Sequence, residues 1–354
     1  MLKRIFSLSL TALVGLTLGM LMLEGLLRYQ SEQILQQYRL DPVSEYYETE
    51  EGIATLRDHE TARTRYAPYV VWVTANHTSD NLNVTDGVRF TPGATCGERS
   101  YRVFVFGGST VFGFATPDGR TIPAYIQQQL AAQRDDPVCV VNYGTAGYTT
   151  TQDVIRLLQL LQVGDVPDVA IFYNGANDVI MAVDAGLQAH SNQPSAALRF
   201  ERPLDAVLTE NSLLYGTLRN HFRPYRQDIP AMERISASPE DLAMIYEANY
   251  TAAQLLAEGY DFEMGFLLQP ILPVTAKELS ANEAYLLGRI DVKYGSFQQD
   301  TYALIAERMQ GQEGFHNLSD LFDGERQTVW VDEVHIAPPH HEGVAAAILA
   351  QLAD

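Results

Sequence analysis

The sequence predicts an α/β fold with a mostly parallel sheet and helices on both of its faces. Three short apolar runs, at residues 101–106, 138–141 and 169–173, have the length and the Val, Ile and Phe content of buried strands. Between them, apolar residues repeat at helical spacing over 122–130 and 154–161. Strands that alternate with helices in this way form parallel βαβ units. We therefore expect one main domain from about residue 95 to residue 354.

Local signals place the remaining elements of this domain. Thr121 stands before the first helical pattern as an N-cap. The segment Ser238–Asp241 has the composition of a helix start and introduces a third helix at 239–258. A fourth strand is expected at 265–268, and a final helix at 343–352 follows a short apolar stretch. These elements extend the alternation of strand and helix to the end of the chain.

Two parts of the chain lack this pattern. Prolines and polar residues replace it after Val179, which predicts an insertion at about 180–260 on the C-terminal edge of the sheet. Residues 29–94 contain tyrosines, threonines and one β-like run at 69–74, with a turn signal at Asp86-Gly87. We interpret residues 29–94 as a stalk and a lead-in segment to the main domain.

The N-terminus predicts a membrane anchor. Residues 5–23 carry no charge and follow Lys3 and Arg4. As a helix they would extend roughly 28 Å, close to a hydrocarbon core of about 30 Å. No small-x-small cleavage site follows, so a single transmembrane helix or signal-anchor at 1–28 is favoured over a cleaved signal peptide or a buried helix. Lys3 and Arg4 would stay in the cytoplasm, with the rest in the periplasm or outside the cell.

Composition limits the partners. The formal net charge of −20 disfavours nucleic acid and anionic membrane surfaces, since binding either one requires clustered Lys and Arg.

The two cysteines are placed where a disulfide can form. Cys96 precedes the first strand and Cys139 lies in the second, so the two thiols would meet in a disulfide if these strands are neighbours. Two unpaired core cysteines are the alternative. Neither cysteine has the spacing of a catalytic thiol or a metal ligand.

Polar loops follow the predicted strands at one edge of the sheet. Gly107-Gly108-Ser109 follows the first strand, 142–147 the second and 174–178 the third. The C-terminal ends of parallel strands meet in one crevice, where ligands bind. Far along the chain, Asp332-Glu333-Val334-His335 precedes the last helix. A serine nucleophile needs a histidine to take its proton and a carboxylate to orient that histidine, so these segments predict a Ser-His-Asp site.

In this order and at these places, the four segments resemble the four blocks of the SGNH hydrolases, also called the GDSL esterase/lipase superfamily. The resemblance implies a flavodoxin-like three-layer α/β/α sandwich and a serine hydrolase that cleaves carboxylic esters through an acyl-enzyme. It makes Ser109 the nucleophile, His335 the general base and Asp332 the acid that orients the base. The oxyanion hole would consist of the backbone N–H groups of Ser109 and Gly147 and the side-chain amide of Asn177.

Two details of this resemblance concern glycines. Gly144 competes with Gly147 for the oxyanion role, although Gly147, five residues after Asn142, fits the family spacing better. The eponymous block has Asp before its serine, whereas this chain has Gly108. Any hydrogen bond made by that Asp is therefore absent, which bears on the substrate class more than on the chemistry.

Other functions fit these motifs less well. Residues 107–113 lack both G-x-G-x-x-G and the Walker pattern, which argues against a phosphate-binding module. Val111 stands where the G-x-S-x-G of ordinary α/β-hydrolases has glycine. His335, His340 and His341 have no partner at a diagnostic metal spacing, so no metal is expected. The acyl-enzyme reaction requires no organic cofactor either. We expect a small-molecule, glycan or lipid ester as substrate. An O-acyltransferase acting on an envelope polysaccharide and a non-catalytic glycan-binding protein are the alternatives.

Overall fold

The computed structural model describes residues 14–30, 45–185 and 237–353, together with residues 212, 214, 215 and 218. The chain divides into two compact units. One comprises Met1–Pro42 and Ser195–Pro230, and the other comprises Val43–Pro194 and Ala231–Asp354. All of the candidate site residues lie in the second, larger unit.

In the smaller unit, residues 14–30 are helical. Glu24 of this helix pairs with Arg28 at 2.9 Å and accepts hydrogen bonds from Ser212 Oγ at 2.9 Å and from the Leu214 N–H at 2.8 Å. Within the described part of the chain, no helix combines the length and the apolar character needed to cross a membrane. The anchor predicted at 1–28 lies in part outside the described residues, because these begin at residue 14.

The larger unit is organised by an eight-stranded sheet in the order β10-β9-β8-β6-β7-β5-β4-β3. Its central strand, β6 (Tyr101–Gly107), lies parallel to β7 (Val138–Asn142) on one side and to β8 (Val169–Asn174) on the other. Beyond β8, β9 (Glu263–Leu268) and β10 (Phe315–Asn317) continue the parallel part of the sheet. The four predicted strands are all present, and the mostly parallel α/β fold is confirmed.

The lead-in segment adds three short strands to the same sheet. β3 (His77–Thr78), β4 (Asn83–Thr85) and β5 (Val88–Arg89) are antiparallel, and β5 joins β7 through the pair Arg89 and Asn142. The sequence interpretation placed these residues outside the main domain because strands of only two or three residues leave no periodic pattern. From residue 45 onward, the described part of the lead-in segment belongs to the larger unit.

Other elements of the lead-in segment precede these strands. The short helix η1 (Glu45–Glu48) is followed by α2 (Glu50–Thr61), and β1 (Thr64–Ala67) pairs with β2 (Val71–Thr74) in a separate hairpin. The indole nitrogen of Trp72 in β2 donates to the carbonyl oxygen of Ala146 at 3.0 Å. The hairpin is therefore in contact with the polar loop that follows β7.

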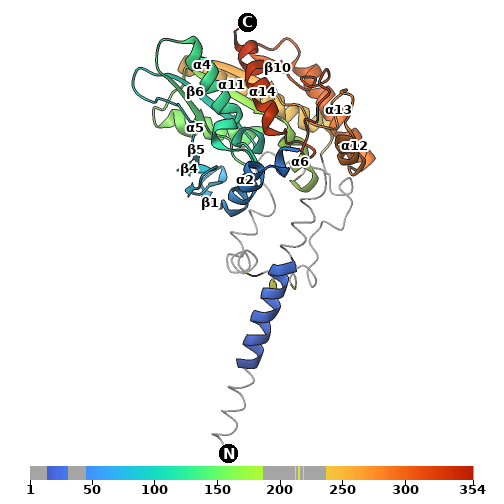
Figure 1. Cartoon of the computed structure of the whole chain (residues 1–354). Helices are drawn as coiled ribbons and strands as arrows, with labels where there is room; N and C mark the ends of the chain where they lie inside the picture. Colours follow the sequence, from blue (N-terminus) through green and yellow to red (C-terminus); the bar gives the residue numbers. More distant parts are fainter. Residues whose placement is uncertain are drawn as a thin grey trace, which may run out of the picture. The chain divides into compact units, whose positions relative to one another are not determined.

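Helices cover both faces of the sheet (Figure 1). Val103 and Val105 of β6 belong to a buried cluster with residues of α4 (Ile122–Gln133) and α14 (His341–Leu352). Their neighbours Phe104 and Phe106 belong to a second cluster on the opposite face. The helices of that face are α5 (Thr150–Gln162), α11 (Pro239–Tyr260) and α13 (Val292–Met309). Burial on both faces explains why the central strands are continuous apolar runs.

The helix-start signals act as predicted. Thr121 Oγ1 accepts the Ala124 N–H at 3.2 Å at the start of α4, and Ser238 and Asp241 form a capping box at the start of α11. Because α11 packs in the core, the end of the range predicted as an insertion is part of the fold. Most of the remaining range, at 186–236, lies outside the described residues.

Cys96 and Cys139 form a disulfide, with their Cα atoms 4.8 Å apart. Cys139 lies in β7, in register with Arg102 near the start of β6. The neighbouring strands that this pairing required are therefore present. The bond lies toward the N-terminal end of β6, whereas Ser109 follows its C-terminal end.

Candidate active site

Ser109 begins a short helix directly after the central strand. β6 ends at Gly107, and α3 (Ser109–Phe112) starts two residues later. A Cβ at Gly107, where φ is +156°, would lie 2.3 Å from the carbonyl oxygen of Tyr173 in β8. Only glycine permits so close an approach between the two backbones. The turn places Ser109 at the C-terminal edge of the sheet.

Asp332 and His335 are carried by one loop. Trp330 and Ile336 form an antiparallel bridge across its base. Asp332 Oδ1 accepts the backbone N–H groups of Val334 at 2.9 Å and of His335 at 2.8 Å. Asp332 therefore stabilises the conformation of the loop as well as facing the imidazole.

The structure brings Ser109, His335 and Asp332 together. Ser109 Oγ lies 2.7 Å from His335 Nε2, and His335 Nδ1 lies 2.6 Å from Asp332 Oδ2. Because an ionised carboxylate only accepts hydrogen bonds, we assign the proton to Nδ1, which leaves Nε2 to accept from the serine hydroxyl. The ring of Phe114 stacks on the imidazole, with 4.5 Å between the ring centroids.

The surroundings of Asp332 favour its charged form. Burial alone raises the pKa of this carboxyl. The interaction with His335 and the hydrogen bonds from the two backbone N–H groups lower the pKa by a larger amount. The net result is a pKa below the ordinary value. Although 44% of its side chain is exposed, Asp332 is therefore a carboxylate at neutral pH and can orient the imidazole.

Asn177 and Gly147 lie on the loops that follow the neighbouring strands. Asn177 belongs to α6 (Ala176–Ala185), directly after β8, and its Nδ2 donates to the carbonyl oxygen of Tyr148 at 2.8 Å. An amide nitrogen carries two protons, so the second remains for another acceptor. Gly147 has φ +79° in the loop after β7. Among the described residues, none accepts a hydrogen bond from its N–H.

Gly144, the competing glycine, has a different environment. Its N–H donates to Asn142 Oδ1 at 2.9 Å. A Cβ at this position would lie 2.3 Å from the backbone nitrogen of Phe112. Gly144 thus allows the loop to approach the backbone of α3, and its donor already has an acceptor. The contacts favour Gly147 for the oxyanion role.

Residues 103–258 match the model of the family described as GDSL-like Lipase/Acylhydrolase. This match supports membership of the GDSL/SGNH superfamily. No curated protein sequence gives a significant match to the chain.

Three solved structures cover most of the chain at low similarity. TesA is 17% identical, with 71% of this chain and 97% of that chain covered and a TM-score of 0.39. LAE5, an α/β hydrolase enzyme from the metagenome of Lake Arreo in Spain, is 17% identical, with 74% and 98% covered and a TM-score of 0.37. A variant of Axe2, an acetyl-xylooligosaccharide esterase from Geobacillus stearothermophilus, is 13% identical, with 74% and 97% covered and a TM-score of 0.40. At these TM-scores, the fold assignment rests on the sheet topology alone.

Gly108, the departure from the GDSL/SGNH pattern, has a steric explanation. A Cβ built on Gly108 would lie 2.2 Å from Asn177 Nδ2, and Cβ atoms essentially never come so close to another non-bonded atom. The amide of Asn177 thus occupies the space that an aspartate at 108 would require. In this arrangement, glycine at 108 and the position of Asn177 depend on each other.

Two buried carboxyls lie on α5 and α6, which follow the candidate oxyanion loops. Asp178 accepts hydrogen bonds from the Thr150 N–H at 3.1 Å and from Thr150 Oγ1 at 2.7 Å. Burial raises the pKa of Asp178 to about 6, although these hydrogen bonds lower it. Burial and then the charge of Asp178 raise the pKa of Asp153 well above its ordinary value. Asp178 thus links α6 to the first turn of α5, and Asp153 of α5 accepts from Asn174 Nδ2 of β8 at 3.5 Å.

The ring nitrogens of the histidines near the candidate base face backbone carbonyl oxygens. His340 Nε2 lies 2.9 Å from the carbonyl oxygen of Thr328, and the two ring nitrogens of His341 lie 3.0 Å from those of Arg120 and Ile336. In the part of the chain that the structure describes, no three His, Cys, Asp or Glu side chains form a group suited to a metal ion.

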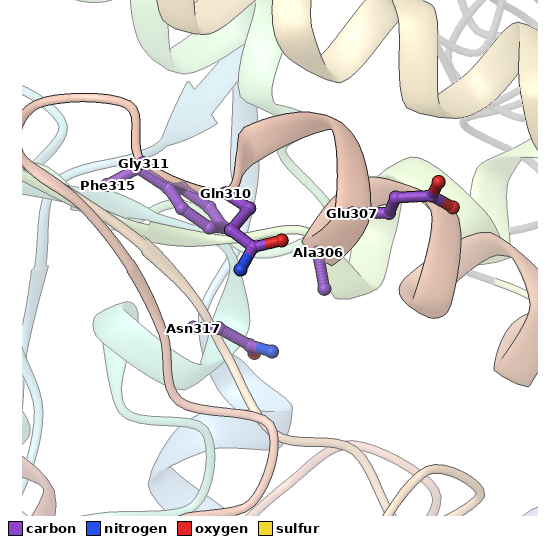
Figure 2. Close-up of a pocket in the computed structure, with 6 residues that line it drawn as sticks. All are labelled: Ala306, Glu307, Gln310, Gly311, Phe315 and Asn317. Atoms are coloured by element: carbon purple, nitrogen blue, oxygen red, sulfur yellow. The ribbon is translucent and has the colours of Figure 1, made fainter.

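A surface pocket lies at the edge of the sheet, where β10 meets the end of α13 (Figure 2). None of the candidate site residues lines it. Its lining residues are Ala306, Glu307, Gln310, Gly311, Phe315 and Asn317. This pocket is therefore separate from the Ser109 site.

Sequence reasoning missed the residues of the lead-in segment that surround the site. Arg89 of β5 and His59 of α2 contact the turn after α3, and Phe114 of this turn stacks on His335. No motif marks Arg89 or His59, because neither the short strand nor the helix shows a periodic pattern in the sequence.

Proposed function

We propose that this chain is a serine hydrolase that cleaves carboxylic esters through an acyl-enzyme. The observation that carries the proposal is the chain of two hydrogen bonds from Ser109 Oγ to His335 Nε2, at 2.7 Å, and from His335 Nδ1 to Asp332 Oδ2, at 2.6 Å. The match of residues 103–258 to an acylhydrolase family supports the same reaction class.

In the proposed mechanism, Ser109 Oγ attacks the ester carbonyl carbon while His335 Nε2 takes the hydroxyl proton. Asp332 keeps the imidazole in its orientation and stabilises the imidazolium that forms. The tetrahedral intermediate then collapses, and the leaving alcohol receives the proton from His335. Water, deprotonated by His335, attacks the acyl-enzyme. Ser109 Oγ then leaves and takes this proton from His335, which releases the carboxylic acid and restores free Ser109.

The negative charge that develops on the carbonyl oxygen requires preorganised donors. We assign these to the backbone N–H groups of Ser109 and Gly147 and to Asn177 Nδ2. A donor of this kind raises kcat by a factor of about 10² to 10³, because it already faces the carbonyl oxygen before the negative charge develops. The half-occupied amide of Asn177 and the unpaired N–H of Gly147, among the described residues, support this assignment.

A fluorophosphonate probe tests the proposed nucleophile. We expect the full-length wild type to gain one covalent adduct that maps to Ser109, and Ser109→Ala to gain none. Ser100→Ala is the matched control, because Ser100 precedes β6 at the opposite end of the strand from Ser109. Equal labelling of the wild type and Ser109→Ala contradicts the proposal.

We propose a small-molecule, glycan or lipid ester as the substrate. A panel of soluble esters with short and long acyl chains separates these classes by kcat/KM. With an O-acetylated polysaccharide, release of acetate indicates hydrolysis, whereas transfer of the acetyl group to an added glycan indicates the O-acyltransferase alternative.

We also propose that the catalytic unit lies outside the cytoplasm, anchored through residues 1–28. The disulfide between Cys96 and Cys139 supports an oxidising compartment. The uncharged run at 5–23, preceded by Lys3 and Arg4, supports the anchor and its orientation. A reporter enzyme fused after residue 60 should be active only on the outer side. Activity confined to the cytoplasm contradicts this orientation.

A further inference from the structure

We propose that Arg89 and His59 are positioning residues for the Ser109–His335 pair and act through the turn at residues 113–116. The inference rests on the proposed hydrolase function. A continuous set of contacts leads from the lead-in segment to this turn and from the turn to the imidazole of His335. Arg89 and His59 lie outside residues 103–258, so the family match does not bear on them.

The turn after α3 has an unfavourable backbone conformation. Gly113 has φ +86°, and Ala115, which carries a side chain, has φ +48°. Residues other than glycine adopt this region rarely, and the conformation persists only where the surrounding structure fixes it. The N–H groups of Gly113 and Phe114 both donate to the carbonyl oxygen of Ser109, at 2.9 and 2.8 Å. The turn is therefore attached directly to the nucleophilic residue.

Arg89 provides much of the contact that fixes this turn. Its side chain is fully buried and paired with Asp118, with 2.9 Å between Arg89 Nε and Asp118 Oδ1. A guanidinium has five N–H donors in a rigid plane, whereas a lysine ammonium has three. The five acceptors around Arg89 are Asp118 Oδ1 and the carbonyl oxygens of Asn81, Phe112, Gly113 and Thr116. Most of these acceptors belong to the turn or to the residues directly beside it.

His59 contacts the same turn from α2. Its Nδ1 accepts the Ala115 N–H at 3.3 Å, and its ring packs edge-on against Phe114 with 4.9 Å between the centroids. Accepting this bond requires a neutral imidazole. Burial, followed by the charges of Arg89 and His335, lowers the pKa of His59 to about 3. His59 therefore remains an acceptor throughout the neutral pH range.

Phe114 connects the turn to the base. Its ring stacks on His335 with an angle of 29° between the planes, while its backbone N–H is bonded to Ser109. One residue of the turn is thus in contact with both partners of the proton transfer. A shift of the turn would change the distance between Ser109 Oγ and His335 Nε2, and proton transfer requires that distance to stay within hydrogen-bond reach.

Three substitutions in the full-length chain test this role. Arg89→Lys keeps the charge beside Asp118 but has too few donors for the turn. Phe114→Leu keeps an apolar side chain but removes the stacked ring. Arg102→Lys is the matched control, because Arg102 also pairs with a carboxylate, at the opposite end of β6. The measurements are kcat and KM for a soluble ester, the rate constant for labelling of Ser109 by a fluorophosphonate, and thermal melting.

We expect Arg89→Lys and Phe114→Leu to lower both kcat and the labelling rate at least about tenfold, with KM within about threefold of wild type. Arg102→Lys should match the wild type in all three quantities. His59→Leu should also lower kcat, and His59→Gln should recover part of the loss, since its amide oxygen can accept the Ala115 N–H. A residue that only stabilised the fold would change the melting temperature and leave the rates of the folded protein unaltered.

Wild-type rates in folded Arg89→Lys and Phe114→Leu would overturn the inference, as would equal losses in Arg102→Lys. If Arg89→Lys does not fold, Phe114→Leu and the His59 variants decide the matter, because they retain the Arg89–Asp118 pair. Failure of the wild type to label at Ser109 refutes the proposed function itself. Labelling of the wild type and of all variants at one rate refutes only the positioning role.

Discussion

The side-chain amide of Asn177 occupies the space that any side chain on Gly108 would need. The two residues belong to different loops, after β8 and after β6, yet a Cβ on Gly108 would lie 2.2 Å from Asn177 Nδ2. A substitution at 108 must therefore displace the amide or the turn that carries Ser109.

Gly108→Ala should lower kcat by about 10² to 10³, the usual effect of removing one oxyanion donor. Asn177→Ala should have an effect of the same size. Because the first substitution acts through Asn177, the double variant should be no worse than Asn177→Ala alone. Steady-state kinetics of the four proteins measure this coupling. Gly119→Ala is the control, since a Cβ at Gly119 has no atom within 4 Å. Multiplicative losses in the double variant would show that the two residues act independently.

Asp332→Asn should lower kcat by about 10³ to 10⁴-fold while the protein stays folded, because an amide can hold the imidazole in the wrong tautomer. Ester hydrolysis and the rate of fluorophosphonate labelling measure the loss. Glu333→Gln serves as control, since this neighbouring carboxylate accepts from Gln298 Nε2 and does not contact His335 in any hydrogen bond of the described residues. Equal losses in both variants would be inconsistent with a specific role for Asp332.

Asp178 should make the fold less stable as the pH rises. Burial raises its pKa from 3.8 to about 6, so the folded state binds this proton more tightly than the unfolded chain does. The resulting stabilisation is complete below the unfolded pKa and is lost as the pH rises through about 6, in total about 3 kcal/mol. Urea unfolding at about pH 4 and about pH 8 should show a smaller loss in Asp178→Asn than in the wild type, with exposed Asp80→Asn as control. Identical losses in the three proteins would contradict the prediction.

Replacing Cys96 and Cys139 by serine should lower the free energy of unfolding by about 2 to 4 kcal/mol. The disulfide closes a loop with a sequence separation of 43, which restricts the unfolded chain. Urea unfolding measures the change, and a thiol reductant should destabilise the wild type but not the double variant. The folded variant should keep its kcat, because the bond lies toward the end of β6 opposite Ser109.

The sequence predicted the centre of the sheet well because those strands are buried on both faces. Phe104 and Val105 point to opposite faces, and both are fully buried. Helix α13 was not predicted, because fully buried Gln298 and Thr301 interrupt the apolar repeat on its inner face. The strands of the lead-in segment are too short to show any period.

The same contrast holds for the candidate site. Ser109, Asp332 and His335 were identified because Gly-Gly-Ser follows the first predicted strand and Asp-x-x-His precedes the last predicted helix, which are the places of two SGNH blocks. Arg89 and Asp118 are 29 residues apart, and nothing in their neighbours indicates that a buried ion pair will form. The other acceptors of Arg89 are backbone carbonyl oxygens. Because every residue has such an oxygen, the sequence does not indicate these contacts.

Asp332 and His335 lie on one loop, bridged at its base by Trp330 and Ile336. The acid and the base therefore belong to one loop, whereas Ser109 belongs to α3. A shift of that loop relative to α3 would separate His335 from Ser109 while leaving the histidine–aspartate pair intact. The stack of Phe114 on the imidazole would be lost in the same step, whereas the bond to Asp332 would keep the proton on Nδ1.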